Sequence, residues 1–343
     1  MYPSDDVMRP GSVASSAAPT LVAAATHGVR TTHAARTTLA AAAFARVEPG
    51  ALVAAAAALC AALATTPAIA APVRVTDDSG RTLELAQPAR RIVSLAPHVT
   101  ELLFSAGAGS HVVGAVRYSD WPPAARAIPR IGDSFALDAE RVVALQPDLA
   151  IVWQHGNADG QLAQLRRLGI PVFASEPSTL ADIASTIRRF AQIAGTEAAG
   201  ERAARAFETA IGALRERYAQ RPPVRVFYQV SARPLLTINR RHLIDDVIRL
   251  CGGVNVFAGL GPLVPNVGAE AVVAADPEAI VAAGGEAGND DGFALWTPLT
   301  RMTATARGNL ILLSSDTISR QSDRVAQGAA MLCAELDRVR ARR

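Results

Sequence analysis

The hexapeptide YSDWPP, residues 118–123, places a phenol, a hydroxyl, a carboxylate and an indole in four successive positions before two prolines. The prolines fix φ twice and supply no N–H donors, so no helix or strand is expected to continue through them. Aromatic and hydrogen-bonding side chains on a stiff loop are typical of ligand contact. The alternative is that Trp121 simply covers a hydrophobic core.

Catalytic motifs are missing from the sequence. It contains no GxSxG, Walker, HExxH or CxxC pattern, and GAGS at 107–110 lacks the third glycine of a dinucleotide site. His98, His111, His155 and His242 show no metal-ligand spacing. The residues therefore indicate binding and no metal site, with an exported α/β hydrolase or transferase as the enzymatic alternative.

The first 70 residues have the pattern of a secretory signal. Arg46 precedes an apolar stretch at 51–64 that is short for a bilayer span, and Ala-Ile-Ala at 68–70 offers small residues for cleavage. A core helix or a retained anchor are the alternatives. We expect a cleaved leader and export to the periplasm.

Charge and cysteines limit the partners and the covalent structure. The net charge is +3 and every basic side chain is an arginine, but the arginines are scattered and no basic run contains aromatics, so a nucleic-acid partner is not expected. Beyond the leader only Cys251 and Cys333 remain. In an exported protein they are candidates for one disulfide, with two buried thiols as the alternative.

A repeat reveals how the elements are organised. AERVVALQPDLAIV at 139–152 and AEAVVAADPEAIV at 269–281 each predict a short helix, a proline and a buried strand, and Glu140 aligns with Glu270. A repeat 130 residues apart indicates two lobes of similar construction. A carboxylate at a helix start is favoured by the helix dipole alone, which is the simplest account of the two glutamates.

Strands and helices alternate on both sides of a long helical segment. This order predicts an α/β fold with two similar lobes, each a mostly parallel sheet with flanking helices. Apolar residues at 203, 206, 207, 210, 211, 214 and 218 predict one buried helical face. A helix capped by Thr196 and ended by Pro222 would form a rod of roughly 36 Å that joins the lobes stiffly. The predicted division is a leader at 1–70, an N-terminal lobe at 71–195, a linking helix at 196–221 and a C-terminal lobe at 222–343.

Six segments together resemble the periplasmic cobalamin (vitamin B12) binding proteins of ABC importers, within the helical-backbone class that also serves haem and iron–siderophores. They are RIVSLAPHVTELLFSAGA, GAVRYSDWPP, AERVVALQPDLAIVW, LRRLGIPVF, CGGVNVFA and PLVPNVGAEAVVAADPEAIV. The resemblance covers roughly residues 73–338. It implies a monomer that carries cobalamin as a transported ligand, not as a cofactor, to the permease subunits, with haem or a ferric siderophore as the alternative ligand.

The resemblance also implies roles for individual residues. Tyr118 matches a ring-contacting tyrosine, Trp153 an aromatic at the cleft rim, and Asp316 to Arg320, with Ser319, a contact loop of the second lobe. Glu140 and Glu270 match glutamates that meet arginines of the permease, and Cys251 and Cys333 match a disulfide pair. Ser134 and Val264 stand where the family pattern has tryptophans, and Phe135 could fill the first of these places with a shift of one position. A smaller corrinoid such as cobinamide therefore becomes a plausible ligand.

Three further residues complete the expectations. His98 heads a predicted helix and faces the cleft, either in a structural role or as a ligand to cobalt or haem iron. Asn157 is expected to offer its amide to the ligand, and Trp296 to lie in the core of the second lobe. The predicted ligand-binding residues are Tyr118, Trp153, Phe135, Ser134, His98, Asn157, Val264, Asp316, Ser319 and Arg320.

Overall fold

The computed structural model describes residues 72–133, 136–157, 159–284 and 291–343. The predicted leader and the predicted ligand contacts Ser134 and Phe135 lie outside the described residues. The described residues belong to one compact unit that contains two parallel sheets. Among them, no helix is both long and apolar enough to cross a membrane.

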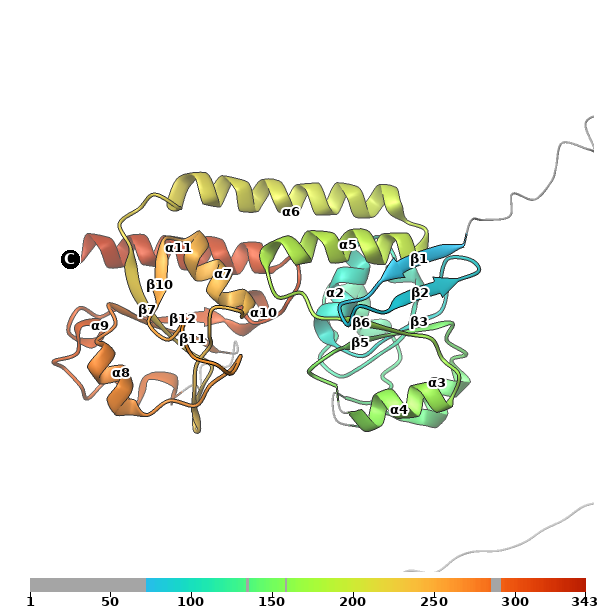
Figure 1. The fold of residues 1–343 in the computed structure, drawn as a ribbon, viewed down its shortest axis with the longest axis horizontal. Helices are drawn as coiled ribbons and strands as arrows, with labels where there is room; N and C mark the ends of the chain where they lie inside the picture. Colours follow the sequence, from blue (N-terminus) through green and yellow to red (C-terminus); the bar gives the residue numbers. More distant parts are fainter. Residues whose placement is uncertain (1–71, 134–135, 158, 285–290) are drawn as a thin grey trace, which may run out of the picture. The chain divides into compact units, whose positions relative to one another are not determined.

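The first sheet is fully parallel and has the order β4-β3-β5-β6. Its strands are β3 (Ile92–Ser94), β4 (Val112–Ala115), β5 (Leu149–Trp153) and β6 (Val172–Ser175). Helices α2 (Pro97–Ser105) and α5 (Leu180–Ala194) cover one face, and α3 (Ala139–Ala144) and α4 (Asp159–Arg167) cover the other (Figure 1). Because both faces are covered, the strands are buried almost throughout, as the continuous apolar runs predict.

Short elements surround this sheet. They are the antiparallel hairpin β1 (Val73–Thr76) and β2 (Thr82–Leu85), and the 3₁₀ turns η1 (Gly109–His111) and η2 (Pro123–Ala127). Strand β4 ends at Ala115, and the turn η2 begins at the second proline of YSDWPP, so no strand runs through this loop.

The second sheet repeats the plan with the order β10-β7-β11-β12, again all parallel. Its strands are β7 (Val224–Gln229), β10 (Gly253–Asn255), β11 (Ala279–Gly284) and β12 (Leu310–Ser314). The helices around it are α7 (Leu243–Leu250), α8 (Ala269–Ala275), α9 (Thr303–Ala306), α10 (Ser315–Ile318) and α11 (Val325–Ala341), and the short elements are β8 (Ser231–Ala232), β9 (Leu235–Leu236) and η3 (Asp291–Phe293). Trp296 is fully buried and donates its indole N–H to Gln229 Oε1 at 2.6 Å, as expected of a core residue.

The two copies of the sequence repeat occupy equivalent places. Each copy forms a short helix followed by a buried strand: α3 and β5 in the first lobe, α8 and β11 in the second. Asp148 accepts hydrogen bonds from the backbone N–H groups of Arg90 and Arg91, and Glu278, its counterpart, accepts one from Arg225 N. The repeated carboxylate therefore anchors the start of the neighbouring strand in both lobes.

Helix α6 (Glu197–Tyr218) is the element that joins the lobes, and Figure 1 shows it running past both of them, above α5 and α11. Its 22 residues at 1.5 Å each span about 33 Å. Thr196 stands at the N-cap position, but the expected cap is wrong: its hydroxyl donates to Ala106 O at 2.7 Å instead. The helix thus begins fixed to the end of α2.

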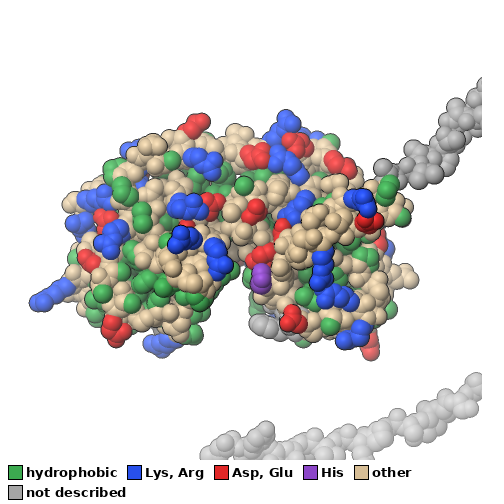
Figure 2. Space-filling model, in the orientation of Figure 1, with side chains coloured by type: hydrophobic (Ala, Val, Ile, Leu, Met, Phe, Trp, Pro, Cys, Tyr) green, Lys and Arg blue, Asp and Glu red, His purple; other side chains and the backbone are tan. Residues whose placement is uncertain are grey.

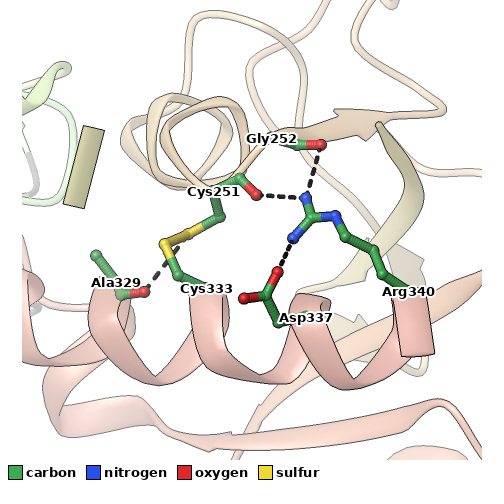
Figure 3. The surroundings of a disulfide bond; sticks show 6 residues. All are labelled: Cys251, Gly252, Ala329, Cys333, Asp337 and Arg340. Atoms are coloured by element: carbon green, nitrogen blue, oxygen red, sulfur yellow. Dashed lines mark hydrogen bonds and ion pairs between the residues drawn. A yellow bond between two sulfur atoms is a disulfide. The ribbon is translucent and has the colours of Figure 1, made fainter. Parts of the chain in front are cut away.

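A disulfide joins Cys251, at the end of α7, to Cys333 in α11, with Cα atoms 4.6 Å apart (Figure 3). Arg340 supports this junction by donating to Cys251 O at 2.7 Å while it pairs with Asp337 at 2.7 Å. The predicted disulfide is confirmed. A covalent loop with this sequence separation of 82 stabilises the folded state by roughly 4 kcal/mol in the chain-entropy description.

Candidate ligand-binding site

A cavity of about 630 Å³ lies between the two lobes. Figure 2 shows the cleft from one side, with a basic side chain on one wall and a histidine and an acidic side chain on the facing wall. A second cavity of about 550 Å³ shares His155, Glu176 and Leu263 with the first, so the two adjoin. The size falls in the range typical of small-molecule sites.

The carboxyl ends of the strands build the walls. His98 follows β3, Trp153 ends β5, and Glu176 follows β6; from the second lobe, Tyr228 comes from β7 and Ser315 follows β12. In parallel sheets this edge is where ligands bind, because the loops that leave the strands converge there. Both lobes therefore present their ligand-binding edges to the same space.

His98 and Trp153 form the aromatic part of the first lobe's wall. Their rings meet edge to face, with centroids 5.5 Å apart and an interplanar angle of 85°. Burial, helped by the nearby Arg320, lowers the pKa of His98 to about 3, so the imidazole is neutral at pH 7. His98 Nε2 and Trp153 Nε1 are buried and have no hydrogen-bond partner in the described structure, so neither atom is satisfied within the lobe.

Trp153 is held in place by its own loop. Gly156 lies directly against the indole, where a Cβ atom would come within 1.8 Å of the ring. Asn157 accepts from Trp153 N at 2.7 Å and donates to Leu95 O at 3.1 Å and Gln161 Oε1 at 3.2 Å. The amide of Asn157 is thus used within the lobe, and Asn157 does not line the cavity; its expected ligand contact stays a prediction.

The second lobe contributes groups that hydrogen bond without charge. Tyr228 is almost fully buried, and burial raises its pKa to about 12 against the opposing hydrogen bond to Ser319. His242 accepts from Ile244 N at 3.2 Å as the N-cap of α7, and burial lowers its pKa to about 4. Val264 and Ser319, both predicted from the sequence, line the same wall.

Arg320 lines the cavity and also reaches across to the first lobe. Its Nη1 donates to Glu101 Oε1 at 2.7 Å and to Tyr118 O at 3.3 Å, and its Nη2 lies 2.8 Å from Asp316. The predicted Asp316 thus acts through Arg320 and does not line the cavity itself. Sequence reasoning missed Glu101, although a carboxylate within the apolar run VTELLF was a signal.

The YSDWPP loop lies at the rim. The Tyr118 side chain is 71% exposed and is not part of the cavity lining; the backbone at Tyr118 has φ +64, in the left-handed region. The guanidinium carbon of Arg324 lies 4.4 Å from the centre of the Trp121 ring, a cation–π contact between the lobes. The prediction that Trp121 covers a hydrophobic core is thus replaced by a stacking role.

Glu140 and Glu270 occupy matching places away from the cavity. Each lies in the first turn of its short helix, on α3 and α8, and each is exposed. No ion pair of either glutamate is found among the described residues. No group of three or more His, Cys, Asp or Glu within the described part of the chain is arranged to hold a metal ion.

Known proteins resemble this chain over most of the described part. The family described as periplasmic binding protein matches residues 92–317. A vitamin B12-binding protein of Vibrio cholerae serotype O1 is 34% identical over 249 residues, which cover 73% of this chain and 90% of the relative. One from Yersinia pestis is 36% identical over 251 residues, which cover 73% and 88%.

Solved structures give the same picture. The periplasmic vitamin B12 binding protein BtuF of Vibrio cholerae superposes with a TM-score of 0.67 at 33% identity, covering 74% of this chain and 98% of that one. The periplasmic heme-binding protein RhuT from Roseiflexus sp. RS-1 has a TM-score of 0.64 at 28% identity, covering 73% and 99%.

Proposed function

Because this chain belongs to the periplasmic binding protein family, we propose that it captures cobalamin or a related corrinoid between its lobes and delivers it to an inner-membrane ABC importer. The observation that carries the proposal is the interlobe cavity of about 630 Å³, which combines the Trp153 ring with neutral hydrogen-bonding groups. A corrinoid is a large flat ring with amide arms, and such walls suit it. The role is binding and release in the periplasm, with no chemical step.

The proposal assigns the contacts as follows. Trp153 and Tyr228 pack against the ring, while His98, Ser319 and Arg320 hydrogen bond to the arms. Tyr118, at the rim, covers the part of the ligand that projects from the cavity. Val264 leaves more room than a tryptophan would, which is compatible with a smaller corrinoid such as cobinamide.

Direct titration tests the ligand. The mature protein is titrated with cyanocobalamin, cobinamide and haemin, and binding is measured by calorimetry and by the quenching of tryptophan fluorescence. We expect a corrinoid Kd below about 10 μM, which corresponds to a binding free energy of about −7 kcal/mol or stronger. Absence of corrinoid binding at that concentration overturns the proposal.

Haem is the second candidate, and His98 is the observation that favours it. A buried neutral imidazole with an unpaired Nε2 is the form in which histidine ligates iron. The similarity to a heme-binding protein at 28% identity supports the same alternative. Tighter binding of haemin than of either corrinoid, with a Soret shift lost in His98→Ala, would favour haem.

For delivery, we propose that Glu140 and Glu270 dock onto basic residues of the two permease subunits. Both side chains are exposed, both lie on matching helices, and Figure 1 shows these helices on the side of the lobes away from α6. A pair of negative charges at equivalent sites would orient the protein on a two-subunit partner.

Charge reversal tests the docking role. The double variant Glu140→Arg/Glu270→Arg should bind cyanocobalamin as the wild type does but lose importer-dependent uptake. The matched control, Glu197→Arg/Glu216→Arg, makes the same charge change at exposed positions of α6 and should keep uptake. Uptake that persists in the first double variant would remove the docking role.

A further inference from the structure

A buried carboxylate of the first lobe holds the arginine that lines the cavity from the second lobe. Glu101, on α2, is only 2% exposed. It accepts from Arg320 Nη1 at 2.7 Å, from Arg324 Nη1 at 3.3 Å and from the hydroxyl of Ser322. Because Glu101 and Arg320 lie 219 positions apart, these contacts join the two lobes.

Arg320 is surrounded by carboxylates. In addition to Glu101, Asp316 lies 2.8 Å from its Nη2 and Asp120 lies 3.4 Å from its Nη1. The guanidinium side chain is only 17% exposed, so water screens these interactions weakly. Arg320 can therefore donate hydrogen bonds at the cavity wall while its positive charge is offset.

Positive charge is limited at the cavity of about 630 Å³, while Arg241 lines the neighbouring cavity of about 550 Å³ and donates to Gly261 O at 2.7 Å. Among the described residues that line the larger cavity, Arg320 is the single arginine, and His98 and His242 are neutral at pH 7 because burial lowers the pKa of each. Glu176 adds a carboxylate, with His155 Nδ1 at 3.3 Å. A ligand carboxylate that enters this cavity loses its hydration, and the charge of Arg320 is already paired with protein carboxylates. Its binding is therefore unfavourable.

We propose that Glu101 is a specificity-determining residue, which neutralises Arg320 at the cavity wall and thereby favours ligands with amide arms over ligands with carboxylate arms. This inference rests on the proposed corrinoid function. It also separates the two candidate ligand classes, because the arms of a corrinoid end in neutral amides, apart from the one that carries the nucleotide phosphate in cobalamin, whereas haem carries propionates. Specificity would then depend on the neutralised charge of Arg320 as much as on the contacts that the cavity makes with the ligand.

The test uses two ligands that differ at one group: cyanocobalamin and its monocarboxylic acid, in which one arm amide is a carboxylate. The wild type should prefer the amide form. Glu101→Gln keeps the size and the acceptor oxygen but removes the charge, and it should shift the ratio of the two Kd values toward the acid by about tenfold, the effect of one close charge pair. Haemin affinity should rise in the same variant.

A second variant and a control keep the result interpretable. Asp316→Asn removes another carboxylate from Arg320 at a more exposed position, so it should shift the ratio of the two Kd values in the same direction. It replaces Glu101→Gln as the test if thermal unfolding shows that Glu101→Gln does not fold. Glu84→Gln removes a carboxylate from an exposed pair on β2 and should leave the ratio unchanged.

The outcomes separate this inference from the proposed function. A wild type that binds neither corrinoid overturns both. A wild type that binds cyanocobalamin, with a Kd ratio that neither folded variant alters, overturns the role of Glu101 alone. A shift in the ratio in both variants but not in Glu84→Gln supports it.

Discussion

His98 and His242 lie in opposite walls of the cavity, and burial lowers the pKa of both, to about 3 and about 4. In the unfolded chain each imidazole titrates near 6.5. The unfolded state therefore binds more protons below that value, and the folded state loses stability as the pH falls from about 6.5 toward 3–4. Above pH 6.5 this contribution to stability is fully present.

Urea unfolding at pH 7 and pH 5 should reveal this loss, at roughly 2 kcal/mol for each histidine. His242→Asn keeps an N-cap acceptor for α7 but removes the titrating group, so over this interval it should lose roughly 2 kcal/mol less stability than the wild type. Burial raises the pKa values of Glu101 and Asp323, which act in the opposite direction, and the comparison of variant with wild type cancels them. Equal losses in both proteins would contradict the assignment.

For single residues, some positions at the cavity could be predicted from the sequence, but contacts between residues distant in the sequence could not. Trp153, Val264 and Ser319 could be predicted as cavity residues because each follows or flanks a recognisable strand or motif. Glu101 could not be paired with Arg320, because no local pattern reports a contact across 219 positions. The hydrogen bonds of the Asn157 amide to Leu95 and Gln161 could not be predicted for a similar reason, because Leu95 becomes a neighbour only after the strands pair.

At the scale of elements, the alternation of strands and helices and the internal repeat predict both sheets, because buried parallel strands produce apolar runs that are visible in a single sequence. The face of α6 was predicted less well. Ala206 and Ala210 are exposed, and the buried stripe is centred on Gly200, Ala204, Phe207 and Ile211. Gly200 lets α6 approach α5 so closely that a Cβ would lie 2.2 Å from Ala191 Cβ, and apolar periodicity does not count glycine as a contact residue.

Charged side chains reinforce the packing of α5 against α6. Arg188 of α5 lies 2.6 Å from Glu201 and 2.6 Å from Glu208, and Arg205 shares Glu201 at 2.6 Å. Exposed pairs contribute little singly, but a network fixes the relative position of two helices better than an isolated pair does. The linking helix is thus bound along its first half to the first lobe.

Several connections join the lobes within the described part of the chain, among them the rigid α6, the apolar core that continues from α5 through α6 to α7 and α11, and the buried contacts of Glu101. None of these resembles a pair of extended hinge strands that could absorb large φ and ψ changes. We therefore predict that ligand binding moves the lobes very little.

Spin labels at Val143→Cys and Val273→Cys, exposed positions on α3 and α8, report this movement by pulsed electron paramagnetic resonance. The distance between them should change by less than about 2 Å when cyanocobalamin binds. Ala210→Pro, in the exposed middle of α6, removes a helical hydrogen bond and should broaden the distance distribution without ligand. A large ligand-induced change in the unmodified helix would mean that α6 is not the element that limits lobe motion, and that the Glu101 contacts open and close with each cycle of binding.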